Sequence, residues 1–280
     1  MPKTDNPLAQ YFRQPAIYIR LPSGGKTWPA GSLDLPANGE VPVYPMTAMD
    51  EITYRTPDAL FNGEATVSVL QSCIPNIKDG WKCPATDLDA LLVAIRIASY
   101  GHQMDISSTC PKCETDQDFG LDLRTVIDGL RAADYSQSLD INDLKIYIRP
   151  LDYQQMTDSN QLQFEQQKLM QLMNDGQAAE ASKVEELNKM MRKIMAVTVT
   201  TIAQSIGEIR ANGAIVTDTA QIEEFLNNCE RKMFESIRDH VVKLREQGEL
   251  KPLKITCPSC QHEYEQAFTL DMARFFGYAS

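Results

Sequence analysis

Two Cys-x-x-Cys pairs in closely similar local sequences constrain the fold of this chain more than any other feature. The first stands in "SSTCPKC", which ends at Cys113, and the second stands in "KITCPSC", which ends at Cys260. Proline follows the first cysteine of each pair and fixes φ in the turn. About half of the chain separates the two pairs. They are therefore either two independent turns or two halves of one site.

The spacing of these cysteines is that of metal-binding turns. One Cys-x-x-Cys turn supplies two thiolates, which is half of a tetrahedral zinc site. The four candidate ligands are Cys110, Cys113, Cys257 and Cys260. Each turn is approached by an expected strand, so we predict that two hairpins meet around one structural zinc per chain in a split zinc-ribbon-like element. The alternatives are iron, reduced structural thiols, local disulfides or a redox-active pair. Glu114 and Gln261 occupy the position after each pair where such turns commonly have glycine, which favours zinc over iron.

The remaining cysteines and the nearest histidine carry weaker signals. Cys73 in an expected helix and Cys229 between two helices are predicted to be buried small apolar residues. Cys83 lies in an expected loop, where it could be exposed. His262 follows Cys260 by two residues, but four thiolates already complete a site. We expect His262 to be a solvated loop residue.

Composition excludes several functional classes. A chain of 280 residues, with 43% hydrophobic and 23% charged residues, can bury a core without a covalent staple. Its formal net charge of −11 argues against nucleic-acid binding and against anionic membrane surfaces. No signal-peptide core and no apolar run of membrane-spanning length is visible. We expect a cytosolic or virion-internal location, where cysteines are metal ligands or buried thiols rather than disulfides.

The chain divides by pattern into four parts. Residues 1–45 are predicted to be an N-terminal arm with short strands, which either reaches a partner or completes its own domain's sheet. Residues 46–152 are predicted to form a helical core with the first cysteine pair. Residues 153–250 form an inserted helical region with a helical hairpin, and residues 251–280 hold the second pair and the C-terminal segment.

Within these parts, turn and cap signals predict individual elements. Thr47 is a candidate cap of a first helix, and Thr86 or Asp87 is the candidate cap of the strongest helix, residues 86–101. That helix is apolar nearly all round, so we expect it at the centre of the core. Other expected elements are a strand at 144–151, a hairpin at 207–216 turning at Asn212-Gly213, and helices from Thr217 or Thr219 and over 231–248. The fold class is α+β, mainly helical with short antiparallel strands.

The inserted region is rich in glutamine, glutamate, leucine and methionine. A break at residues 174–176 predicts two helices folded back on each other. The methionines here are Met170, Met173, Met190, Met191 and Met195. Methionine adapts to irregular partners, so this face is a candidate binding surface, although packing between the two helices is the simpler explanation.

No arrangement typical of an enzyme is present in the sequence. There are three histidines, and no phosphate-binding loop, nucleophile elbow or H-E-x-x-H motif. Asp87 and Asp89 stand where carboxylates favour a helix N-terminus. Arg96 lies inside the apolar helix and requires a partner or an exposed end. A metal held by four cysteines leaves no open position for catalysis. We therefore expect a non-catalytic protein.

One stretch resembles a known family. It reads "ALFNGEATVSVLQSCIPNIKDGWKCPATDLDALLVAIRIASYG" and is followed by "CPKC". Over residues 45–125, and more loosely over the last thirty, the chain resembles the baseplate hub proteins of T4-type contractile bacteriophage tails. The resemblance rests on the Cys-Ile-Pro segment, the Asp-Leu-Asp before the Ile-Arg-Ile-Ala helix, and the cysteine turns.

This resemblance implies a role in building the tail baseplate hub. The chain would be a hub component or an assembly factor, found in the host cytoplasm during assembly or in the virion tail. Its partners would be other tail proteins, namely hub proteins or the tape-measure chain, and no catalytic activity is implied. The alternative is a zinc-ribbon module that binds nucleic acid or a transcription complex. Five acidic residues near the cysteines speak against it: Glu114, Asp116, Asp118, Glu263 and Glu265.

Overall fold

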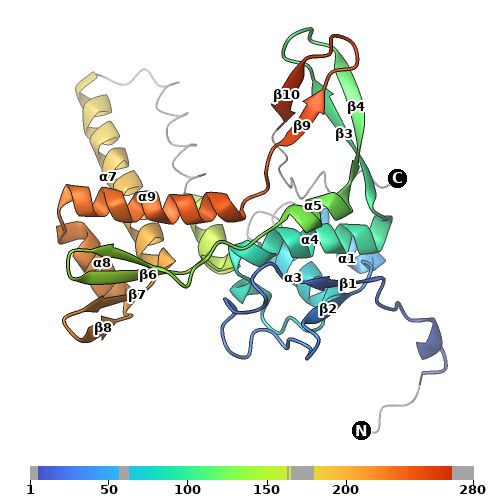
Figure 1. The fold of residues 1–280 in the computed structure, drawn as a ribbon, viewed down its shortest axis with the longest axis horizontal. Coiled ribbons are helices and arrows are strands. Elements are labelled where there is room, and N and C mark those ends of the chain that lie inside the picture. Colours follow the sequence, from blue (N-terminus) through green and yellow to red (C-terminus); the bar gives the residue numbers. More distant parts are fainter. Residues whose placement is uncertain (1–5, 57–62, 163, 165–179, 267–280) are drawn as a thin grey trace.

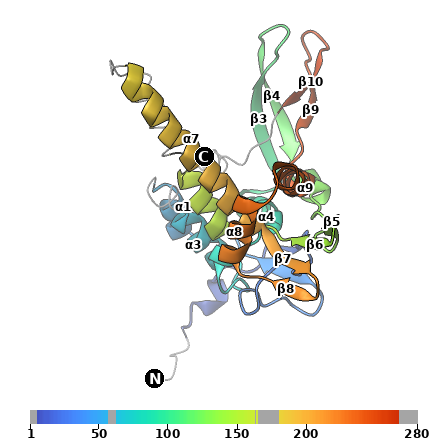
Figure 2. The same cartoon turned by 90° about the vertical axis from the view of Figure 1, so that its left-hand side faces the viewer.

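The computed structural model describes residues 6–56, 63–162, 164 and 180–266. Its helices and antiparallel strands form two hydrophobic cores, and two β-hairpins project together from one side of the molecule (Figures 1 and 2). The predicted α+β class is confirmed. Within the described ranges, no helix combines the length and the apolar character needed to cross a membrane. The division of the chain into four parts stays a prediction.

The first core is built around α4 (Ala85–Tyr100), as expected from its apolar sequence. Leu91 and Ile95 of this helix have no exposed surface. Thr47 caps α1 as predicted, because its side chain accepts from the Asp50 amide while the Asp50 carboxylate accepts from the Thr47 amide. The other helices of this core are α1 (Ala48–Tyr54), α3 (Glu64–Cys73), η2 (Gly80–Lys82) and α5 (Leu123–Gly129).

The N-terminal strands pack onto this first core. After η1 (Ala9–Tyr11), β1 (Ile17–Arg20) and β2 (Glu40–Val43) form an antiparallel pair. Val41 and Val43 are fully buried and belong to the same apolar cluster as α4. The strands of this segment therefore contribute to the core of their own chain.

The second core lies under a four-stranded antiparallel sheet with the order β5-β6-β7-β8. The strands are β5 (Ser138–Ile141), β6 (Leu144–Ile148), β7 (Ile206–Ala211) and β8 (Ala214–Val216). The helices are α7 (Glu180–Ser205), α8 (Thr219–Asn228) and α9 (Arg231–Gly248). The predicted turn between β7 and β8 is confirmed, because Asn212 and Gly213 have φ of 48° and 83°.

One projecting hairpin follows a helix of the first core in the chain, and the other follows a helix of the second core. The pair β3 (Gln103–Thr109) and β4 (Asp116–Asp122) lies between α4 and α5 in the chain. The pair β9 (Leu253–Thr256) and β10 (Glu263–Gln266) follows α9. In both views the two hairpins lie next to each other, with their loops at the same end. Hairpins that are far apart in sequence therefore meet at their tips.

The expected capping of α4 is wrong. The helix begins at Ala85 with Pro84 in the N-cap position, and that residue makes no side-chain cap. The carboxylate of Asp87 instead accepts hydrogen bonds from the Ser23 amide (2.8 Å), the Ser23 hydroxyl (2.5 Å) and the Trp28 indole (2.7 Å). Asp87 is fully buried, so these bonds from a distant loop replace its contact with water.

The possible exposure of Cys83 is also wrong, since its side chain has no exposed surface. Pro84 forms an isolated bridge with Asp152, and the Cys83 carbonyl accepts from the Tyr153 amide. These contacts fold the expected loop back onto the first core. Cys73 is buried, as predicted, but the predicted burial of Cys229 is wrong, because this residue is only half-buried.

The methionine-rich hairpin falls largely on residues that the structure does not describe. The predicted turn at 174–176, together with Met170 and Met173, lies outside the described residues, and so do the side chains of Met190 and Met191. The described part of α7 exposes 68% of Met195. The binding face of this hairpin stays a prediction.

Candidate metal centre

The two cysteine turns have the same backbone geometry. In the first, the Cys110 amide donates to the Thr115 carbonyl (3.1 Å), and the Glu114 amide donates to the Cys110 carbonyl (2.9 Å). In the second, the Cys257 amide donates to the His262 carbonyl (2.9 Å), and the Gln261 amide donates to the Cys257 carbonyl (2.8 Å). The similarity of the two sequences thus corresponds to two equivalent hairpin loops.

A left-handed residue closes each loop. Glu114 has φ of 55° and Gln261 has φ of 57°, in the region that favours glycine. These residues directly follow Cys113 and Cys260, the position where glycine is common in such turns. Both loops therefore hold a non-glycine residue in the same unfavourable conformation, which costs on the order of 1 kcal/mol or more at each position.

The four cysteine sulfurs form one cluster. All four Sγ atoms lie within 4.8 Å of one another. The Sγ atoms of Cys110 and Cys260 are 3.7 Å apart, and those of Cys113 and Cys257 are 3.6 Å apart. A disulfide requires about 2.05 Å. Zinc–sulfur bonds of about 2.3 Å in a tetrahedron place sulfurs about 3.8 Å apart. The donor set and its spacing are compatible with a tetrahedral zinc site.

The sulfurs of the second turn differ in their pKa. Burial opposes ionisation of Cys257, but the backbone amides of Cys260 and Ser259 outweigh it and lower the pKa of this thiol to about 6. At Cys260, the His262 amide favours the thiolate, but burial and the neighbouring cysteines outweigh it and raise the pKa to about 12. Four thiols in such proximity cannot all ionise without a cation, and a bound metal would remove their protons.

Polar contacts between the hairpins support the sulfur cluster. The Ser108 hydroxyl of β3 is 2.8 Å from the Tyr264 hydroxyl of β10, and it donates to Oε1 of Gln266 at 2.8 Å. The Gln117 side chain of β4 donates to the Tyr264 hydroxyl at 3.3 Å. These four residues are not predicted from the sequence. No local pattern marks them, because their partners come from the other end of the chain.

The side chains of the other predicted residues are not part of the sulfur cluster, although the backbone of His262 belongs to the second cysteine turn. His262 is half-buried and stacks on Tyr264, with ring centroids 6.2 Å apart, rather than being fully solvated. Arg96 is 5% exposed and lies over the Tyr100 ring at 4.6 Å, so a cation–π contact accompanies its burial. The structure therefore does not join Arg96 or His262 to the four sulfurs.

The surface around the cysteine turns is acidic. Five carboxylate side chains are exposed on the two hairpins: Glu114, Asp116, Asp118, Glu263 and Glu265. The basic residues closest in sequence are Lys112 and Lys254, which are also exposed. Nucleic-acid binding depends on cations that neutralise phosphates, and on these two hairpins exposed acidic side chains outnumber the basic ones near the cysteines.

Comparison with known proteins finds a match to one protein family. No curated protein matches the chain, and no solved structure matches it. The family described as T4 bacteriophage base plate protein matches residues 18–277, which is nearly the whole chain and includes both cysteine turns. The chain belongs to the T4 bacteriophage base plate protein family.

Proposed function

We propose that this chain is a non-catalytic assembly protein of the phage tail baseplate hub. It acts as a hub component or as a chaperone that binds hub or tape-measure proteins. The observation that carries the proposal is the cluster of four cysteines in a member of a baseplate family. A metal at this cluster would join a hairpin of the first core to a hairpin of the second.

We further propose that one structural zinc per chain occupies the cluster. The two turns would then form a split zinc ribbon, with the region between them as an insertion. Four protein ligands saturate tetrahedral zinc and leave no position for substrate or water, which supports a structural role. The acidic surface of the hairpins supports protein partners rather than nucleic acid.

The assembly role is tested by affinity capture from cells in which the phage is replicating. Tagged chain should enrich hub or tape-measure proteins, identified by mass spectrometry, over a tag-only control. Failure to enrich any tail protein would contradict the role. Mass spectrometry of purified virions then separates the two versions, because a hub component remains in the particle and a chaperone is absent from it.

The same capture experiment also tests whether assembly requires the cysteine cluster. Cys257→Ser removes one cluster ligand, whereas Cys229→Ser changes a half-buried cysteine outside the cluster. Capture of tail proteins should fall with Cys257→Ser and persist with Cys229→Ser. Equal capture by both variants would show that assembly does not require the joined hairpins.

A further inference from the structure

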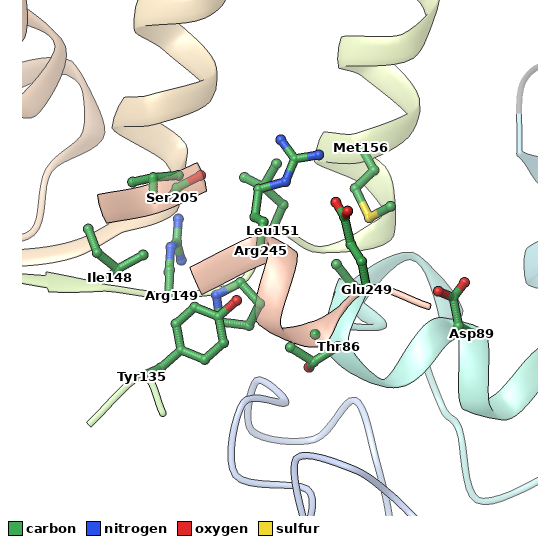
Figure 3. Close-up of a pocket in the computed structure, with 14 residues that line it drawn as sticks. Thr86, Asp89, Tyr135, Ile148, Arg149, Leu151, Met156, Ser205, Arg245 and Glu249 are labelled. Carbon is green, nitrogen blue, oxygen red and sulfur yellow. The ribbon is translucent and has the colours of Figure 1, made fainter. Parts of the chain in front are cut away.

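A cavity lies at the junction of the two cores, away from the cysteine cluster. Its volume is about 220 Å³, and α4, α9, the segment after β6 and the helical residues 153–162 supply its walls. Figure 3 shows Asp89 and Glu249 on the side of α4, and Tyr135 and Arg149 on the opposite side. The cavity thus has a carboxylate end.

Asp89 is the central polar group of that end. It forms no hydrogen bond or salt bridge with any described residue. Burial, and secondarily the nearby Glu249 carboxylate, raise the pKa of Asp89 to about 6. The hydroxyl of Thr86, on the same wall and 7% exposed, also has no hydrogen-bond partner within the described ranges. The Thr86 oxygen is itself covered, so Asp89 is the unpartnered polar group on this wall of the cavity.

Neither arginine of the cavity forms an ion pair with Asp89 or Glu249. Nε of Arg149 donates to the Gln204 carbonyl at 3.0 Å. Arg245 forms no ion pair with Asp89 or Glu249 within 4.0 Å. A cationic group from outside the chain would therefore meet two carboxylates that lack a close positive partner.

Apolar side chains line the cavity between the charged groups. Leu151, Met156 and Val241 lie within its lining. Lysine and arginine bury their aliphatic stems along such surfaces and keep the charged head near polar groups. The combination of an apolar wall and a carboxylate end matches a side chain of this type.

A larger cavity of about 620 Å³ lies next to it. The two share Tyr135, Ile148, Arg149 and Pro150 in their linings. We refer to the two together as the cleft between the two cores. Its larger part is lined by acidic and basic side chains, among them Asp134, Asp152, Lys26 and Lys82. The net charge of −11 adds a general attraction for a basic partner.

We propose that this cleft binds an extended segment of a basic partner protein, which inserts a lysine or arginine side chain between Asp89 and Glu249. The inference deepens the proposed assembly role, on which its biological meaning rests. Its chemistry, however, can be tested without any phage protein.

The probe is n-butylguanidinium chloride, added to the full chain labelled with ¹³C at its methionine methyl groups. Met156 lines the cavity, and Met156→Leu assigns its signal in the NMR spectrum. n-Butylguanidinium should shift this signal saturably, whereas n-pentanol and butyrate should not. An equal response to n-pentanol, or no saturable response to the cation, would overturn the proposal.

Two variants locate the interaction. Asp89→Asn should weaken binding of the probe at least tenfold, and Asp143→Asn, which changes an exposed residue in the β5–β6 turn, should leave it unchanged. Binding should also weaken as pH falls through about 6, where Asp89 takes up a proton. Glu249, Arg245, Arg149 and Tyr135 face the same cavity. If Asp89→Asn bound n-butylguanidinium with unchanged affinity, the proposed site would be wrong.

The result is separable from the assembly role. If the probe binds but wild-type chain captures no tail protein, the assembly role fails and the site stands. If tail proteins are captured and the probe does not bind, the site fails and the assembly role stands.

Discussion

The helix α4 and the two cysteine hairpins are held in place by different forces. Along α4, Leu91, Val93 and Ile95 have no exposed surface and pack within a large apolar cluster. The hairpin strands instead alternate exposed and half-buried residues, and their described buried side chains are few. Isolated two-stranded hairpins are marginally stable in water.

The first region is therefore stabilised by apolar burial, whereas the second, if our proposal is right, depends on the cross-link that a metal at the four cysteines would supply. The hairpins contact each other through the sulfur cluster and through hydrogen bonds that join Ser108 and Gln117 to Tyr264 and Gln266. Changes to α4 should therefore lower global stability without affecting metal binding. Changes to the cluster should release the hairpins and leave the first core folded.

The largest expected effect comes from Cys257→Ser. Because structural zinc sites supply about 10 kcal/mol or more of apparent binding free energy, losing one ligand should release the metal and separate the hairpins. Hydrogen exchange should show faster exchange in residues 103–122 and 253–266, with α4 still protected. The hairpin amides of Cys229→Ser should exchange at the rates of the wild type. If the hairpin amides of Cys257→Ser were as protected as those of the wild type, the cluster would not be what holds the hairpins.

Leu91→Ala tests the other side of the comparison. Leu91 is fully buried, so its truncation should lower the free energy of unfolding by about 2–5 kcal/mol. Urea denaturation measures this change, and zinc content should stay the same. Leu8→Ala, at a side chain 61% exposed, should change stability by less than about 0.5 kcal/mol. Loss of zinc from folded Leu91→Ala would show that the regions are coupled.

Asp87→Ala removes the acceptor that holds the N-terminal loop on α4. The Ser23 amide and hydroxyl and the Trp28 indole would lose their partner. We expect the free energy of unfolding to fall by about 2–4 kcal/mol, because these donors are left buried and unpaired. Thermal or urea unfolding at pH 7 measures the loss. A stability equal to wild type would mean that the loop contributes nothing to the core.

Asp89→Asn should raise the free energy of unfolding, whereas Asp87→Ala should lower it. The raised pKa of Asp89, about 6, means that the folded state favours the protonated carboxyl over the ionised carboxylate. Its contribution to stability is full below its ordinary pKa and is lost as pH rises through about 6. The variant should therefore be more stable than wild type at pH 7.5, by at most about 3 kcal/mol, with little difference near pH 4. Destabilisation at pH 7.5 would indicate a favourable partner for the ionised carboxylate.

Tyr264→Phe gives the smallest expected effect. It removes the hydroxyl that contacts Ser108 and Gln117 across the hairpins. The hairpins should remain joined through the cysteines, with a loss of about 0.5–1.5 kcal/mol in local stability. Hydrogen exchange of β10 measures it. Exchange as fast as in Cys257→Ser would mean that polar contacts, rather than the cluster, hold the hairpins.

The sequence predicts best where the signal is local. The cysteine turns repeat the same short pattern, and the apolar run of α4 marks it as buried wherever it packs. The role of Asp87 could not be predicted, because its donors, Ser23 and Trp28, are distant in sequence. Local propensity therefore suggested a helix cap instead. The same limit applies to the Ser108–Tyr264 contact and to the cavity at Asp89, whose walls come from separate parts of the chain.

Metal analysis of the chain purified without added zinc tests the proposed zinc site most directly. Elemental analysis should give about one zinc per chain, and X-ray absorption should show four sulfur ligands at about 2.3 Å. Cys257→Ser should lose this zinc. Well-folded wild-type chain with almost no bound metal would contradict the proposal that a zinc ion joins the two hairpins.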